Sequence, residues 1–391
     1  MDEIVFLTGA TGFIGGWLAL WFIDKGYRLH LLVRPGKNES AEARVISFLE
    51  GLAQTDELRR KVREQVRVFA GDITEEGLGL SSTDRREALA GVKSFIHCAA
   101  VPKFVEDKEQ TVYRTNLVGT ENVIKVVKES EVSDFHYVST AYVCGKRHGV
   151  MAEDDLSDDA GFHNIYEETK FLAEKKVREF AASGASTVTI YRPSIVLGHS
   201  KTGATCNFIG PYVFFSALSK CKTLFERDLA RGGKMAPQLG IRREGERLFV
   251  PFKVRGLKDA TNNFVPVDYV VNAIGTLFQT AAARGKTFHL TNPAPISNRK
   301  LEEYTNDIMG ICGAEVVEKP SEGSGLMDFL GERFRREADI YAPYMTYEPA
   351  FDRTNIDSLL PGMTPPANDR RYFETLIGYG AGVNWGARAR S

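Results

Sequence analysis

The sequence lacks the cysteine patterns that mark disulfide-rich or zinc-binding domains. Its five cysteines are scattered and odd in number, and no CxxC pair occurs. We therefore expect neither a disulfide framework nor a zinc ribbon. A reducing cytosol is the simplest compartment for such a chain, which predicts a cytoplasmic protein. The seven histidines show no HExxH spacing and have no cysteine partners, so no metal site is predicted.

An excess of one charge is also lacking, as is an uninterrupted membrane-length run. The formal net charge is −1, which gives no overall attraction to nucleic acid or an anionic membrane. Residues 4–23 are apolar, but they contain four glycines and follow Asp2 and Glu3. A signal peptide would begin with basic residues, and a membrane helix would need a packing reason for these glycines. We expect no nucleic-acid partner and no integral membrane association.

Internal repeats, low-complexity tracts and flexible linkers are absent as well. The 391 residues are too many for one minimal domain and fit one large or two coupled domains. Hydrophobic residues make up 43% and charged residues 26%, which are ordinary globular values. A sizeable core is therefore expected.

What the first half does contain is a regular alternation of strands and helices. Short apolar runs predict buried strands at residues 4–8, 28–33, 66–70, 93–98, 135–139 and 187–191. Amphipathic stretches between them predict helices near 13–25, 41–64, 83–90, 105–130 and 164–183. This alternation is typical of βαβ units in a parallel sheet with helices on both faces. Right-handed crossovers then give a Rossmann-type, doubly wound α/β fold.

The alternation stops after about residue 200. An apolar stretch at 208–218 is followed by a Gly- and Arg-rich loop at 231–247 and a short strand-like run at 248–251. One more strand is expected near 286–291, and a helix at 298–310. We interpret residues 1–200 as a dinucleotide-binding domain to which the strand near 286–291 returns. Residues 201–391 would form a smaller, mostly substrate-binding part.

A glycine-rich loop follows the first predicted strand and opens the first predicted helix. Dinucleotide binding needs this context, because the glycines allow a tight turn, a close backbone approach to pyrophosphate, and helix–strand packing. The helix N-terminus then offers N–H groups to the phosphates. The loop residues are Gly9, Thr11, Gly12, Phe13, Ile14 and Gly15.

Arg34 indicates which dinucleotide is used. A site for NAD usually places Asp or Glu after the second strand, where it holds the ribose 2′-hydroxyl. Arg34 stands there instead and suits the 2′-phosphate of NADPH through charge-assisted hydrogen bonds. Arg44, early in the next helix, is a second candidate. Either arginine could also be a plain surface charge.

Two further strand ends carry candidate cofactor contacts. Asp72 could meet the adenine amino group and Ile73 could cover its ring, although a plain turn aspartate is the alternative. Small residues Ala99 and Ala100 would let the cofactor lie against the edge of the sheet. After the strand at 187–191, Pro193 begins a stiffened turn that can abut the nicotinamide.

Tyr166 and Lys170 are the candidate catalytic pair. Their i, i+4 spacing places them on one face of the helix predicted at 164–183. A lysine ammonium near the phenol would lower the pKa of the tyrosine, which could then exchange a proton with a carbonyl or alcohol oxygen. A hydroxyl from Ser139 or Thr140, at the end of the preceding strand, could hydrogen-bond the same oxygen.

In this order the motifs resemble the extended short-chain dehydrogenases/reductases. They run from TGATGFIG through GDI, HCAA, VSTAYV and YxxxK to YRPSIVLG, and cover residues 1–200. The resemblance implies that Thr140, Tyr166 and Lys170 form the catalytic triad. It implies a structural or proton-relay role for Asn116. The candidate cofactor-binding residues are then Gly9, Thr11, Gly12, Phe13, Ile14, Gly15, Arg34, Arg44, Asp72, Ile73, Ala99, Ala100, Val101, Asn116, Tyr166, Lys170, Pro193 and Ser194.

A narrower resemblance is to thioester reductase domains and fatty acyl-CoA reductases. It rests on the Ser-Thr-Ala-Tyr-Val strand end, on Ala99-Ala100-Val101 followed by Phe104, on residues 263–270 and on residues 351–355. It implies NADPH-dependent reduction of an acyl thioester to an aldehyde, and leaves open a second hydride step that would give the alcohol. Because we expect no adenylation or carrier domain, the acyl group would come from coenzyme A or a separate acyl or peptidyl carrier protein. A homodimer is expected by analogy.

The substrate predictions have alternatives. Apolar residues at 207–225 and 339–351 suit an acyl tail, but they could equally be core. Basic residues at 231–255 could meet carrier or coenzyme phosphates, or lie in a solvated loop. The same cofactor residues would serve a ketone or aldehyde reductase or a hydroxysteroid-like dehydrogenase. A nucleotide-sugar epimerase or dehydratase is disfavoured by Arg34, and a silent NADPH-sensing protein by the intact triad.

Overall fold

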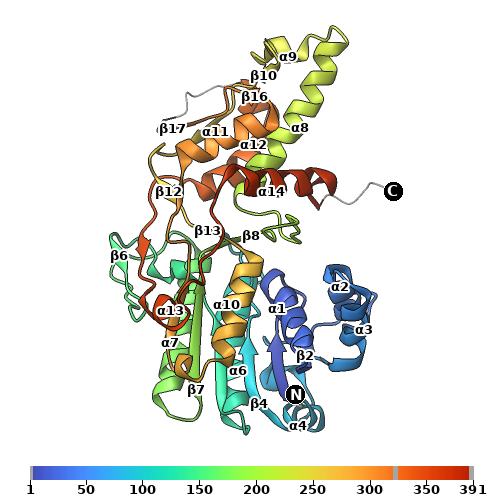
Figure 1. Cartoon of the computed structure of the whole chain (residues 1–391), viewed down its shortest axis with the longest axis vertical. Helices are drawn as coiled ribbons and strands as arrows, with labels where there is room; N and C mark the ends of the chain where they lie inside the picture. The colour runs from blue at the N-terminus through green and yellow to red at the C-terminus, as the bar shows by residue number, and fades with distance from the viewer. Residues whose placement is uncertain (1–2, 320–324, 387–391) are drawn as a thin grey trace. The chain divides into compact units, whose positions relative to one another are not determined.

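The computed structural model describes residues 3–319 and 325–386, which form two compact units (Figure 1). The first unit comprises the described residues up to Ser194 together with Val267–Thr291 and Ala350–Thr364. The second unit comprises Ile195–Pro266, Asn292–Pro349 and the described residues from Pro365 onward. Each unit has elements from three separate parts of the chain.

The first unit is built on a seven-stranded sheet with the order β14-β7-β5-β4-β1-β2-β3, in which every neighbouring pair is parallel. The strands are β1 (Ile4–Thr8), β2 (Arg28–Val33), β3 (Val66–Ala70), β4 (Val92–His97), β5 (Asp134–Val138), β7 (Thr187–Pro193) and β14 (Thr287–Leu290). A two-residue pair, β6 (Val150–Met151) with β18 (Ala350–Phe351), lies beside it. The Rossmann-type, doubly wound α/β fold expected from the sequence is confirmed.

Helices follow the strands as the alternating pattern predicts. They are α1 (Phe13–Asp24), α2 (Ala41–Leu52), α3 (Asp56–Gln65), η1 (Glu76–Gly79), α4 (Ser82–Leu89), α5 (Thr111–Tyr113), the π-helical turn η2 (Arg114–Val118), α6 (Gly119–Lys128), η3 (Ala141–Cys144), α7 (Ile165–Ala182), α10 (Val267–Gln279), η4 (Ala281–Ala283) and α13 (Thr354–Leu359). Figure 1 shows α10 beside α1, where the Trp21 indole N–H donates to Asn272 Oδ1 at 3.1 Å. Helix α6 packs against α7.

Two predicted helix boundaries were wrong, and side-chain capping explains both. The stretch at 41–64 is two helices, because the Thr55 hydroxyl accepts the Leu58 N–H and starts α3. The helix predicted from residue 105 begins only at Thr111. Its first N–H groups are taken by the carboxylates of Asp107 and Glu106, which hold the preceding segment outside the helix.

The core of the first unit forms around the middle strands, which are buried on both faces. Phe6 of β1 stacks on Phe95 of β4 at 4.6 Å between ring centroids, and Phe95 meets Phe135 of β5 at 5.8 Å. Offset aromatic pairs of this kind add to the stabilisation from burial alone. This packing fixes the carboxyl ends of the central strands, where the candidate site residues lie.

The second unit has helices and very short strands. The helices are α8 (Pro211–Ala230), α9 (Met235–Gln238), α11 (Asn298–Met309), α12 (Gly325–Tyr341), α14 (Arg370–Gly382) and η5 (Asn384–Gly386). The strand groups are β8 (Ile195–Leu197) with β13 (Phe264–Pro266), β9 (Arg242–Glu244) with β10 (Arg247–Phe249) and β16 (Ile311–Cys312), β11 (Lys253–Arg255) with β17 (Glu315–Val317), and β12 (Thr261–Asn262) with β15 (Ile296–Ser297). The region expected to be a loop at 231–247 therefore contains α9 and β9.

Candidate active site

The glycine loop joins β1 to α1 and packs against the end of β4. Gly9 has φ +82°, and a Cβ there would lie 2.7 Å from the Ala99 backbone nitrogen, so only glycine fits. The Gly12 N–H donates to the Gly9 carbonyl at 2.8 Å and closes the turn. Helix α1 begins at Phe13 without a side-chain cap. The first N–H groups of α1 therefore have no side-chain cap, as a helix N-terminus that binds phosphate requires.

Arg34, Arg44 and Asp72 lie together beyond the ends of β2 and β3. Arg34 Nη1 is 3.7 Å from Asp72 Oδ2. Arg44 Nη1 donates to the Arg34 carbonyl at 2.8 Å, which draws α2 toward the end of β2. Asp72 Oδ1 accepts the N–H of Thr74 in a local turn. Two guanidinium groups thus lie at the place where the sequence predicts the 2′-phosphate.

Ile73 and Asn116 are both buried. The Ile73 side chain packs where a Cβ on Gly119 of α6 would stand, so it belongs to the core as well as to the end of β3. Asn116, in the π-helical turn, accepts the Val101 N–H at 2.8 Å and donates to the Val101 carbonyl. Its amide also donates to the Thr169 hydroxyl on α7 at 3.1 Å. Asn116 therefore ties the segment after β4, which carries Ala99 and Ala100, to α7.

Of the two hydroxyls left open by the sequence, Thr140 is the one beside Tyr166. Thr140 follows β5 and caps η3, and its hydroxyl lies in hydrogen-bond contact with the Tyr166 phenol. Ser139 instead donates to the Glu174 carboxylate at 2.6 Å. The Tyr166 ring, which stacks on Phe104 at 6.2 Å between centroids, is only partly buried.

The Tyr166 pKa departs from the sequence-based expectation. Desolvation by the surrounding protein raises the pKa of the phenol to about 12, against the opposing effect of the Thr140 hydroxyl. Lys170 does not counteract this burial, because its ammonium donates elsewhere. Its ammonium donates to the Tyr137 phenol oxygen and the Val138 carbonyl, each at 2.8 Å. Burial lowers the pKa of Lys170 to about 7.

Pro193 ends the neighbouring strand β7 and Ser194 follows it, so both lie at the same edge of the sheet as Thr140. The Thr140 hydroxyl donates to the Pro193 carbonyl at 3.4 Å. The Ser194 N–H donates to the Leu290 carbonyl of β14. The structure thus brings the predicted triad together with these two residues within the first unit.

Sequence reasoning missed three buried residues at this edge: Tyr137, Glu174 and Arg192. Glu174 follows Lys170 by four residues and so shares the face of α7 that carries Tyr166 and Lys170, which the spacing could have revealed. Tyr137 and Ser139 are two residues apart at the end of β5, so their side chains point to the same side of the extended chain. The pairing of Arg192 with Glu174 depends on tertiary contacts that no local pattern indicates.

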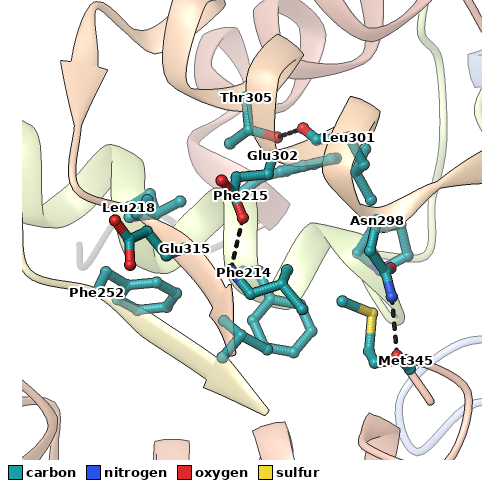
Figure 2. Close-up of a pocket in the computed structure, with 14 residues that line it drawn as sticks. Phe214, Phe215, Leu218, Phe252, Asn298, Leu301, Glu302, Thr305, Glu315 and Met345 are labelled. Carbon is teal, nitrogen blue, oxygen red and sulfur yellow. Dashed lines mark hydrogen bonds between the residues drawn. The ribbon is translucent and has the colours of Figure 1, made fainter. Parts of the chain in front are cut away.

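The second unit contains an apolar cavity of about 60 Å³. Figure 2 shows Phe214 and Phe252 on one side of it and Leu301 and Thr305 of α11 on the other. Some of its polar wall groups are bonded within the protein: Thr305 donates to the Leu301 carbonyl at 2.7 Å and Glu302 accepts the Val316 N–H at 2.7 Å. Most of the remaining lining side chains are apolar, which favours an apolar occupant.

The structure bears on the expectations of no membrane helix and no metal site only within residues 3–319 and 325–386. In these ranges no helix is long and apolar enough to cross a membrane. Nor do His, Cys, Asp and Glu side chains of these ranges gather into a group that could hold a metal ion. Several basic residues expected to meet phosphates are paired instead, among them Arg247, which lies 2.8 Å from Asp307.

The fold and this edge of the sheet define an oxidoreductase of the extended short-chain dehydrogenase/reductase type. The family model described as male sterility protein, an NAD-binding family, matches residues 7–274. The chain belongs to this family. The resemblance to thioester reductase domains and fatty acyl-CoA reductases is thereby confirmed.

Curated relatives are longer than this chain. A nonribosomal peptide synthetase of Aspergillus flavus is 26% identical over 316 residues, which are 77% of this chain and 27% of that protein. A fatty acyl-CoA reductase of Drosophila melanogaster is 31% identical over 243 residues, 54% of this chain and 46% of the relative. An aldehyde reductase of Aspergillus flavus is 27% identical over 414 residues, 96% of this chain and 36% of the relative. The chain thus spans less than half the length of each.

Solved structures share the fold. The terminal R domain from the myxalamid PKS-NRPS biosynthetic pathway has a TM-score of 0.77 and 23% identity, covering 98% of this chain and 92% of that one. A thiolation-reductase di-domain from an archaeal non-ribosomal peptide synthetase has a TM-score of 0.68 and 20% identity, covering 99% and 77%. A UDP-glucuronic acid 4-epimerase from Bacillus cereus has a TM-score of 0.64 at 17% identity.

Proposed function

We propose that this protein reduces an acyl thioester to an aldehyde with NADPH. The observation that carries the proposal is the gathering of Thr140, Tyr166 and Lys170 at the edge of the sheet next to the glycine loop. NADPH would supply the hydride. Thioester, NADPH and a proton would give aldehyde, thiol and NADP⁺. The reductase names of the relatives support this chemistry over epimerisation.

The residues of the chain would act on the carbonyl oxygen. Thr140 and Tyr166 each have a hydroxyl that can donate to it, and a neutral phenol is the form that donates. Because the pKa of Tyr166 is raised to about 12, the phenol is protonated at neutral pH. Lys170 would hold the nicotinamide ribose. These donors stabilise the negative charge that develops when hydride attacks the carbonyl carbon.

For the cofactor we propose NADPH rather than NADH, on the basis of Arg34 and Arg44 beyond β2. The first unit would hold the cofactor, with contacts from the loop after β1, from Asp72, and from the segment Ala99–Val101. The second unit would hold the acyl group, and its apolar cavity supports a hydrophobic acyl chain. The two units differ from the boundaries predicted at residues 1–200 and 201–391, because Val267–Thr291 and Ala350–Thr364 belong to the first unit.

The acyl donor would be a carrier-bound or coenzyme A thioester. A nonribosomal peptide synthetase and a fatty acyl-CoA reductase among the relatives support the two forms respectively. The aldehyde reductase relative supports a second hydride step that gives the alcohol. We further propose a cytoplasmic location. The homodimer stays a prediction, which light scattering of the purified protein would check.

The decisive experiment follows NADPH absorbance and free thiol together with acyl-CoA, carrier-bound acyl groups, aldehydes and ketones. NADPH oxidation with equal thiol release, lost in Tyr166→Phe, is the expected result. Removing the phenol hydroxyl should cost at least about 100-fold in kcat. NADPH oxidation with ketones or aldehydes and no thiol release would contradict the thioester proposal and leave a carbonyl reductase.

A further inference from the structure

A chain of buried polar groups lies behind Lys170, away from the predicted reacting atoms. Lys170 Nζ donates to the Tyr137 phenol oxygen at 2.8 Å. Burial raises the pKa of the Tyr137 phenol, and the nearby Thr120 hydroxyl acts against that rise. Thr120 Oγ1 is 3.0 Å from His97 Nε2, and His97 Nδ1 is 2.7 Å from Thr8 Oγ1. The chain thus reaches from α7 through β5, α6 and β4 to the end of β1.

The donors and acceptors in this chain have one consistent arrangement. The single proton of Thr120 goes to the Asn116 carbonyl at 2.6 Å, so the Thr120 oxygen accepts from His97. Burial lowers the pKa of His97 to about 3, so the ring is neutral, donates from Nε2 and accepts from Thr8 at Nδ1. The Tyr137 oxygen accepts from Lys170.

Lys170 has few other partners. Within the described part of the chain, its ammonium reaches the Tyr137 oxygen and the Val138 carbonyl, and it lies 4.2 Å from the centre of the Tyr137 ring. Two of its three protons are therefore used behind the site. No acceptor in the described part of the chain takes the third.

The ionisable groups that face Lys170 give it little compensating charge. On the β4 side His97 is neutral, and burial raises the pKa of the Cys98 thiol to about 12. Tyr166 is a neutral phenol. Glu174, four residues further along α7, is charged, but Arg192 at 2.6 Å and Arg178 already balance it. A buried ammonium in such a place depends on dipoles that accept its protons.

We propose that Tyr137 is a positioning residue for the reduction proposed above: its phenol oxygen fixes the Lys170 ammonium and keeps it charged. The geometry assigns this role to a residue outside the Thr140–Tyr166–Lys170 set. Thr120, whose oxygen accepts from His97, would act one step further back through its place beside the Tyr137 phenol. The catalytic role of Tyr137 rests on the proposed function, but its contact with Lys170 does not depend on that function.

The test is the titration of Lys170 in protein with ¹³C at the lysine ε-carbon, without cofactor, read by NMR. Lys170→Arg identifies the signal, because it removes only that lysine. Tyr137→Phe should lower the pH at which Lys170 loses its proton by about one unit, since a hydrogen bond to a charged group is lost. Thr120→Ala, which removes the hydroxyl beside the Tyr137 phenol, should shift this titration in the same direction by less.

Tyr27→Phe is the matched control. Tyr27 is a buried tyrosine of the same unit whose oxygen accepts from Gln279 at 3.2 Å, and it does not contact Lys170. The Lys170 titration should be unchanged in this variant. An unchanged titration in folded Tyr137→Phe, or an equal shift in Tyr27→Phe, would overturn the proposal. If Tyr137→Phe does not fold, the Thr120→Ala titration alone decides.

A second readout connects the contact to catalysis. The pH dependence of kcat/KM reports groups of the free enzyme. Its alkaline limb should move to lower pH in Tyr137→Phe, so that the variant loses more activity at pH 8 than at pH 6. A uniform loss at every pH would contradict the positioning role. Because the NMR titration needs no turnover, a protein that reduces no thioester would refute the proposed function without deciding this inference.

Discussion

Arg192 and Glu174 form a fully buried ion pair behind the candidate active site. Arg192 Nη2 lies 2.6 Å from one carboxylate oxygen of Glu174, and Nε lies 3.1 Å from the other. The second oxygen also accepts the Ser139 hydroxyl. The pair therefore joins α7, which carries Tyr166, to the ends of β5 and β7. We interpret this ion pair as the contact that fixes the positions of these three elements relative to one another.

Glu174→Gln should destabilise the first unit strongly, because it leaves the Arg192 guanidinium buried without a counter-charge. Breaking a buried pair from one side costs about 3–5 kcal/mol in the free energy of unfolding. Urea unfolding measures this loss. Glu168→Gln is the control, since Glu168 is exposed on the same helix. Equal urea midpoints for the two variants would show that the pair contributes nothing.

Arg34→Ala should weaken the binding of NADPH selectively. If the guanidinium binds the 2′-phosphate, its loss should raise the KM for NADPH by about 10- to 100-fold, the value of a charge-assisted hydrogen bond. The KM for NADH should change little. The exposed contact of Arg34 with Asp72 contributes little to stability, so the fold should survive.

Arg28→Ala is the control for the cofactor prediction, because Arg28 is exposed at the opposite end of β2. It should leave both Michaelis constants unchanged. A parallel loss of NADPH and NADH affinity in Arg34→Ala would mean that the arginine supports the loop rather than the phosphate.

Val254→Phe should narrow the cavity of the second unit, which Val254 lines. If the cavity takes an acyl chain, kcat/KM should fall about tenfold or more for long-chain thioesters, because the pocket loses room for methylene groups. Activity with acetyl-CoA should be nearly unchanged. Val383→Phe introduces the same side chain at a position that is 41% exposed. A similar loss of kcat/KM for short-chain and long-chain thioesters would show that the cavity does not bind the acyl chain.

The sequence predicted the sheet well because its strands are continuous apolar runs. Strands β1, β2 and β3 have the predicted bounds, and β4 and β5 are displaced by one residue. Helix ends were less predictable, since the caps at Thr55 and Glu106 depend on single side chains. In the second unit the strands have two or three residues, which is too short for any periodicity to appear.

For the site, motif residues were easier to predict than their supports. The YxxxK spacing and the strand end before Thr140 both mark chemistry along the chain. Whether Lys170 pairs with Tyr166 or with Tyr137 depends on how α7 lies over β5. That tertiary contact also decides that burial, not the ammonium, dominates the pKa of Tyr166. Local spacing alone therefore gave the wrong sign for this shift.

Buried histidines should make the first unit sensitive to acid. Burial lowers the pKa of His97 and His136 to about 3 and of His289 to about 4. Each unfolded histidine binds a proton below about pH 6.5 that its folded form does not. Stability from these groups is therefore complete above pH 6.5 and is lost as the pH falls. Glu153 opposes them, because burial raises its pKa to about 7 and the folded form binds the extra proton.

Near pH 5.5, unfolding lets the three histidines take up about three protons and makes Glu153 release about one, which is a net uptake of about two protons. The free energy of unfolding should therefore fall by about 3 kcal/mol from pH 6 to pH 5. Urea unfolding at the two pH values measures this difference. His136→Gln should reduce it by about 1 kcal/mol, because one of the three contributions is removed. A difference that is the same in both proteins would show that His136 titrates normally in the fold, and that its burial does not govern acid sensitivity.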